Sequence, residues 1–117
     1  EIAEKGKPIA TWALGRIAKS NREMAPRIVD GLKKAAEKGS GKAVWALEEI
    51  ARSSEDIAHM VVDALIEIAE KGKPIATWAL GRIAKSNREM APRILYWLKK
   101  AAKKGNRTAA RALKDFS

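Results

Sequence analysis

Apolar residues recur three and four positions apart along most of the chain, whereas no stretch alternates between apolar and polar at every second position. In the segment 22–38, Met24, Ile28, Leu32 and Ala35 fall on one face of a helix. The pattern therefore predicts helices and no strands. The helices are expected over about 8–19, 22–38, 41–52, 54–71, 74–85, 87–104 and 106–116.

Glycine and proline mark where these helices should begin and end. A glycine follows several of the helical segments and is expected to take the left-handed conformation that stops a helix, at Gly6, Gly39, Gly72 and Gly105. Pro26 lies inside the segment 22–38, so the helix either begins near Pro26 or has a kinked first turn. Capping boxes are expected at Ser20/Glu23, Ser86/Glu89 and, as a variant, Ser53/Asp56.

The chain also repeats itself. Residues 1–28 are identical to residues 67–94, at an offset of 66, and half that offset aligns 2–34 with 35–67 at 15 of 33 positions. A pair of short helices cannot bury its apolar face alone, so we expect the units to stack on one another. The chain is then one domain, 1–117, composed of the units 2–34, 35–67, 68–100 and a C-terminal cap, 101–117.

Two sequence patterns resemble the helices of a known repeat class. ATWALGRIA (10–18 and 76–84) and AVWALEEIA (43–51) resemble the tryptophan helix of armadillo repeats, and APRIVDGLKKA (25–35) resembles the proline-opened second helix of armadillo and HEAT repeats. The unit of 33 residues is shorter than the usual length of about 40–47. The resemblance implies an all-α, right-handed α-solenoid of two-helix armadillo/HEAT-like repeats.

The same resemblance implies a binding groove. In armadillo proteins the tryptophan helix lines a concave surface for extended peptides, and an asparagine four residues later holds the peptide backbone. This chain keeps the tryptophan but carries charged residues at the asparagine position. The candidate partner-binding residues for a protein or peptide are Trp12, Arg16, Trp45, Glu49, Trp78 and Arg82. The alternative is that the tryptophans pack between units, and repeated aromatics at helical spacing favour it.

The net charge of +10 invites a nucleic-acid interpretation, but its distribution does not favour one. Units 2–34 and 68–100 each hold eight basic residues, whereas unit 35–67 holds three basic and seven acidic residues. An acidic unit in the middle would repel a phosphate backbone. Nucleic-acid binding is therefore the alternative function, through Lys33, Lys34, Lys99, Lys100, Lys103 and Lys104.

Equivalent positions of successive units alternate in the sign of their charge. Three such ladders are Arg16/Glu49/Arg82/Asp115, Arg22/Glu55/Arg88 and Lys34/Glu67/Lys100. We expect each side chain to pair with the one 33 residues away. Such pairs would penalise a stack that is displaced by one unit, since like charges would then face each other.

The third unit departs from the first at one place, where Val29-Asp30-Gly31 becomes Leu95-Tyr96-Trp97. Two added aromatic side chains indicate either an apolar patch for self-association or a cover for the flank of the last unit. The first unit also lacks half of its cover, so either a second copy supplies it or the array is part of a longer one. A homo-oligomer is expected on these grounds.

No constellation for catalysis is present. The chain has no cysteine and a single histidine, His59, and the carboxylates are spaced as in salt bridges. We expect no enzyme activity, no cofactor, no metal site and no membrane span. The chain should be soluble, and cytoplasmic if expressed in a cell, although nothing directs it to a compartment. Near-verbatim copies favour an engineered or consensus-type scaffold for binding or self-assembly over a recent duplication, with no natural function required.

Overall fold

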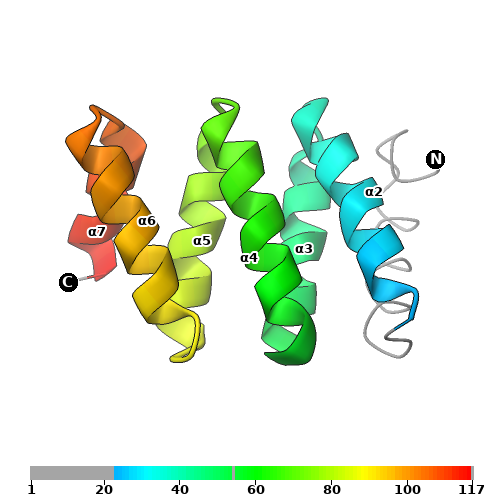
Figure 1. Ribbon diagram of the computed structural model, residues 1–117. Helices are drawn as coiled ribbons and strands as arrows, with labels where there is room; N and C mark the ends of the chain where they lie inside the picture. The colour runs from blue at the N-terminus through cyan, green and yellow to red at the C-terminus, as the bar shows by residue number, and fades with distance from the viewer. Residues whose placement is uncertain (1–22, 54, 117) are drawn as a thin grey trace.

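The computed structural model describes residues 23–53 and 55–116, and every regular element in this part is an α-helix. The expected helix over 8–19, with Trp12 and Arg16, lies outside the described residues. Two layers are formed, with α2, α4 and α6 in one and α3, α5 and α7 in the other (Figure 1). The helices are α2 (Ala25–Glu37), α3 (Gly41–Ser53), α4 (Glu55–Glu70), α5 (Pro74–Ser86), α6 (Ala91–Lys103) and α7 (Arg107–Phe116).

Each helix contacts its neighbours in sequence, and several contact the next helix but one. Helix α2 packs against both α3 and α4, α3 packs against α5, and α5 packs against α7. Short connections between consecutive helices leave them antiparallel across the two layers, so helices within a layer run the same way. The prediction of an all-α fold is confirmed, and the predicted helices match the observed ones to within a few residues at each end.

The core lies between the two layers and consists mainly of alanine, leucine, isoleucine and valine. Leu32, Leu65 and Leu98 are fully buried at equivalent positions of α2, α4 and α6. Leu47 and Leu80 are likewise fully buried in α3 and α5. Because many of the other buried residues are alanines, the helices can approach one another closely. None of the described helices is long and apolar enough to cross a membrane.

Proline and glycine act at the helix ends as expected. Helices α2 and α6 begin one residue before Pro26 and Pro92, where the missing N–H costs no helical hydrogen bond. This excludes a kinked first turn for α2. The three described glycines that follow helices have positive φ: +108° at Gly39, +86° at Gly72 and +99° at Gly105.

The expected capping box at Ser86 and Glu89 is wrong. Ser86 is the last residue of α5, and its hydroxyl donates to backbone carbonyls of that same helix. Asn87 instead caps the turn that precedes α6, and its Oδ1 accepts from the backbone N–H groups of Glu89 and Met90 at 3.0 and 3.2 Å. At the start of α3 and α7, Ser40 Oγ accepts from Ala43 N–H and Asn106 Oδ1 from Ala109 N–H.

Alanine substitutions at two glycines should have opposite effects on stability. Gly72→Ala is expected to lower the free energy of unfolding by about 1–2 kcal/mol, because φ is +86° there and a Cβ is strained in that region. Gly31→Ala should raise it by about 0.5–1 kcal/mol, because Gly31 is helical and a Cβ would meet no atom within 4 Å. Urea denaturation measures both. Equal effects of the two substitutions would contradict the assigned helix ends.

Candidate functional site

The described groove residues lie on two helices in contact, α3 and α5. Trp45 on α3 is 52% exposed, whereas Trp78 on α5 is half-buried and packs against the core. Glu49 and Arg82 lie one turn further along the same two helices. The structure therefore brings four of the six candidate residues onto one layer, with one tryptophan open to solvent and one that partly fills the space beside it.

A buried carboxylate lies next to these residues. Glu48 on α3 accepts two hydrogen bonds from Arg82 on α5, with Nε to Oε2 at 2.8 Å and Nη2 to Oε1 at 2.9 Å. Arg52 adds a third, from its Nη2 to Oε2 at 3.0 Å. The Glu48 side chain is only 4% exposed. Two guanidinium groups thus neutralise and hydrogen-bond a charge that would otherwise be costly to bury.

This arrangement affects the protonation of Arg82. The hydrogen bond with Glu48 raises the pKa of Arg82 above its ordinary value, and the attraction to that carboxylate acts in the same direction, while partial burial acts against both. The guanidinium therefore stays charged, and the bidentate pair fixes the position of α5 against α3. Sequence analysis missed Glu48. The available signal was a glutamate at a position where the two copies carry Gly15 and Gly81.

The charge ladders were predicted with the wrong spacing. Three pairs between neighbouring helices of one layer are separated by 34 residues and not by 33: Lys33 with Glu67 at 3.2 Å, Glu37 with Lys71 at 2.7 Å, and Glu48 with Arg82. A fourth, Arg93 with Asp63, is separated by 30 residues. Equivalent positions of two parallel helices point the same way, so side chains that face each other must come from different positions. Lys34, which was expected to pair with Glu67, instead binds Asp30 of its own helix at 3.3 Å.

A cleft lies between α5 and α7, one unit further along. Its wall is Trp78, and Arg82, Lys85 and Asp115 surround it, with a volume of about 140 Å³. Gly81 lines the cleft at the position where α3 carries Glu48, and Ala112 of α7 lies close to it. In the layer of α3, α5 and α7, an ion cluster therefore lies between α3 and α5, and a cleft lies between α5 and α7.

The proposed self-association residues point in three directions around α6. Leu95 and Trp97 are partly buried against the core, and the Trp97 indole Nε1 donates to Glu70 on α4 at 3.3 Å. Tyr96 alone is widely open, at 66% exposed, with Lys100 Nζ 5.6 Å from its ring centroid. An apolar contact with a second copy would therefore depend on Tyr96.

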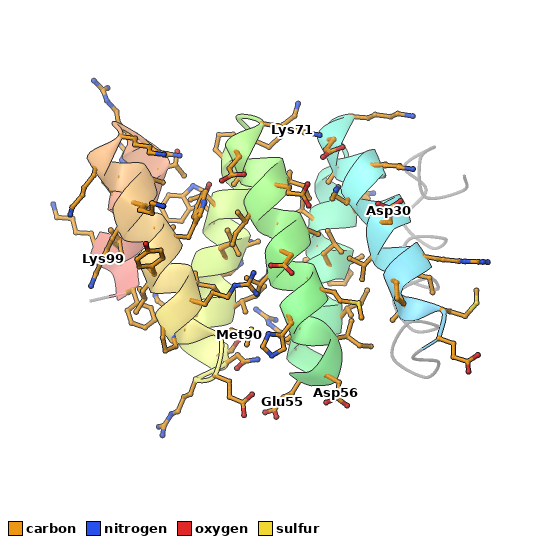
Figure 2. All side chains as sticks on the ribbon, in the orientation of Figure 1. Asp30, Glu55, Asp56, Lys71, Met90 and Lys99 are labelled. Carbon is orange, nitrogen blue, oxygen red and sulfur yellow. The ribbon has the colours of Figure 1, made fainter. Side chains whose placement is uncertain are left out.

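The basic residues that were candidates for nucleic-acid binding do not form one continuous surface of unpaired charges. Lys33 and Lys34 on α2 are both engaged, by Glu67 and Asp30 respectively. The lysines of α6 and its C-terminal end are exposed, and Lys99 projects away from the helices in Figure 2. His59 is exposed on α4, and no group of three or more His, Cys, Asp or Glu residues in the described part of the chain could hold a metal ion.

Comparisons with known proteins give no family for this chain. No protein-family model matches it, and no curated protein or solved structure matches it either. The armadillo/HEAT resemblance therefore stays a prediction that depends on the residues alone.

Removal of the buried charge of Glu48 should lower the free energy of unfolding more than removal of the charge of Glu49. Glu48→Gln is expected to lower the free energy of unfolding by about 1–2 kcal/mol, because two guanidinium groups lose their carboxylate in a place that is poor in water. The matched change Glu49→Gln should cost less than about 1 kcal/mol, because Glu49 is more exposed. Urea denaturation at low and high salt measures both. A Glu48 effect that disappears in high salt would contradict the burial argument.

Proposed function

We propose that this chain is a non-enzymatic scaffold for protein or peptide binding, engineered or consensus-derived as a right-handed α-solenoid of 33-residue armadillo/HEAT-like units. Support comes from the packing of helices 33 residues apart against each other, α2 with α4, α3 with α5 and α5 with α7. Equivalent leucines are buried in successive helices, as expected if each helical pair depends on the next.

The observation that carries the binding proposal is the pair of tryptophans on contacting, parallel helices. Trp45 leaves about half of its surface in water, and Trp78 forms the wall of an open cleft beside Arg82 and Lys85. A tryptophan this exposed adds little to the core, yet it offers a rigid face to an aliphatic or cationic side chain. An extended peptide that crosses α3, α5 and α7 would place one side chain on Trp45 and another in the cleft.

The groove can be tested with random short peptides displayed on phage and selected on the intact chain. Selected peptides are then titrated against variants by calorimetry. Trp45→Ala is expected to weaken binding by about tenfold or more, because an aromatic anchor is removed without disturbance of buried contacts. The matched control is Tyr96→Ala, which removes an exposed aromatic from the other layer and should leave the affinity unchanged.

Other outcomes separate the alternatives. Peptides whose affinity falls equally with Trp45→Ala and Tyr96→Ala would contradict a groove on the α3/α5/α7 layer. Single-stranded and duplex oligonucleotides are titrated in parallel across a salt series. Tight binding at low salt that weakens steeply as salt rises would support the basic surface as the functional one.

Self-assembly is the second mode of the same scaffold, and its basis is the exposure of Tyr96 on α6. Static light scattering over a range of concentrations should show association of the intact chain at high micromolar concentration. Tyr96→Ala should shift it toward the monomer, because the apolar contact area is lost. Trp45→Ala serves as the control and should associate like the parent. A parent chain that stays monomeric throughout would rule this mode out.

A further inference from the structure

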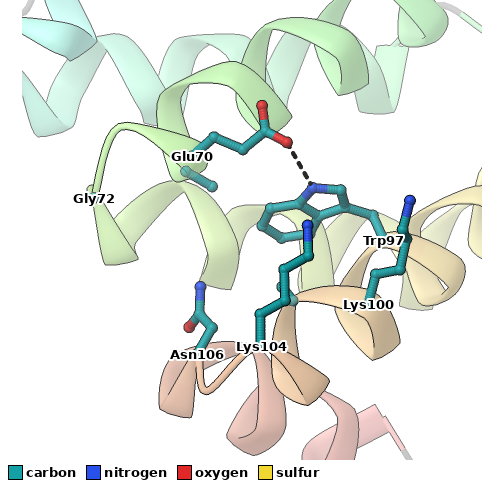
Figure 3. Close-up of a pocket in the computed structure, with 8 residues that line it drawn as sticks. Glu70, Gly72, Trp97, Lys100, Lys104 and Asn106 are labelled. Carbon is teal, nitrogen blue, oxygen red and sulfur yellow. Dashed lines mark hydrogen bonds between the residues drawn. The ribbon is translucent and has the colours of Figure 1, made fainter.

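A cavity of about 330 Å³ opens between the C-terminal ends of α4 and α6 (Figure 3). Trp97 forms one wall, and Ala69 and Ala101 contribute small apolar side chains to the lining. The amino groups of Lys100 and Lys104 lie around it, with Asn106 below them. The volume falls within the range of small-molecule sites in proteins.

The corresponding pair α2 and α4 is closer together at its C-terminal end, although a hollow of about 250 Å³ remains beside Ala64 and Glu67. Ala64 stands there in the position of Trp97, and the backbones of α2 and α4 are in close contact. Glu37 and Lys71 then close the C-terminal ends of these helices with a salt bridge of 2.7 Å. Helices α4 and α6 make no comparable backbone contact within the described part of the chain, because the indole lies between them.

The Trp97 indole also changes which polar side chains pair between α4 and α6. By analogy with Glu37 and Lys71, Glu70 and Lys104 would be expected to pair. Glu70 instead accepts the indole N–H of Trp97, which holds the ring upright in the cavity wall. Within the described residues Lys104 then forms no salt bridge, and Lys100 has only the weak contact with the Tyr96 ring. Two cations therefore border the cavity with no carboxylate bound to either, while the Glu70 carboxylate on the same rim is held by the indole N–H.

This combination selects a particular ligand chemistry. A flat ring fits against the indole face, where offset stacking adds to the apolar contact with the two alanines. A single anionic group on that ring would lie between the two lysine amino groups. The side-chain amide of Asn106 can donate as well, because its Oδ1 is already used by Ala109 N–H. A cationic ligand would suit the indole face but would meet the two lysine amino groups at the rim.

We propose that the cavity between α4 and α6 is a binding site for a small aromatic anion, with its ring on Trp97 and its charged group between Lys100 and Lys104. The site belongs to the α2/α4/α6 layer. It is independent of the peptide groove on α3, α5 and α7, so either proposal can fail without the other.

The probe for the test is naphthalene-2-sulfonate, titrated into the intact chain and followed by amide chemical shifts in NMR spectra. Binding is expected with a dissociation constant below about 1 mM, within the efficiency range of a ligand of this size. The shifts should be confined to residues 69–72 and 97–106, which surround the cavity. Methanesulfonate, which has the charge but no ring, should leave the same amides unchanged.

Variants test the two halves of the site separately. Trp97→Ala should weaken binding by at least about tenfold, because it removes the wall and lets α4 and α6 approach as α2 and α4 do. The double change Lys100→Gln with Lys104→Gln should weaken the sulfonate by about fivefold or more and leave binding of neutral 2-naphthol unchanged. Its matched control is Lys99→Gln with Lys103→Gln, which removes the same charge from exposed positions outside the cavity.

The lysine variants change only exposed side chains, so they keep the test valid even if Trp97→Ala unfolds. The proposal is overturned if the sulfonate does not bind at millimolar concentration, or if its shifts centre on Trp45 or Trp78. It is also overturned if both lysine pairs weaken binding equally, since the attraction would then come from net charge alone.

Discussion

The packing of the two helical layers on each other is the interaction on which the rest of this structure depends. Helices of 10–16 residues are marginal in water on their own, so their order comes from the apolar faces that they share. Leu32, Leu65 and Leu98 mark this shared face at intervals of 33 residues, and alanines around them keep the helices close. Loss of one helical pair would leave an apolar face uncovered on each of its neighbours, so the helices on both sides of the lost pair should become less stable.

Charged residues then decide which part of one helix meets which part of the next. Salt bridges on the exposed rim, such as the one between Lys33 and Glu67, contribute little free energy each. The buried carboxylate of Glu48 is different, because any sliding of α5 along α3 would separate it from Arg82 and leave a charge without a partner. Apolar packing therefore supplies most of the stability, and this one ion cluster restricts where α5 lies along α3.

The helices could be predicted from the sequence because the apolar spacing and the helix-stopping glycines act locally. The residues that depend on contacts between units could not. The predicted ladders are spaced by 33 residues, whereas Lys33–Glu67 and Glu37–Lys71 are spaced by 34, because equivalent positions of parallel helices point the same way and do not face each other. Similarly, Ser86 was the expected cap, but the turn after α5 places the Asn87 amide oxygen against the N–H groups of Glu89 and Met90.

The candidate site was predicted in part. The tryptophan spacing placed Trp45 and Trp78 in one layer, because identical spacing on parallel helices places side chains on one surface. Its asymmetry was not predicted: a buried ion cluster at Glu48 lies between α3 and α5, whereas a cleft beside Trp78 lies between α5 and α7. The aromatic pair on α6 was recognised as unusual, but the opposite environments of Tyr96 and Trp97 follow from the rotation between consecutive helical residues.

The indole between α4 and α6 has a geometric consequence for the whole array. It spreads one layer at that point, while α5 and α7 in the opposite layer remain in contact. A stack that is widened on one side only must curve toward the other side. A longer chain that repeated this tryptophan in each added helical pair would bend more strongly than one with alanine there. A single side chain per unit would then set the curvature of a long assembly.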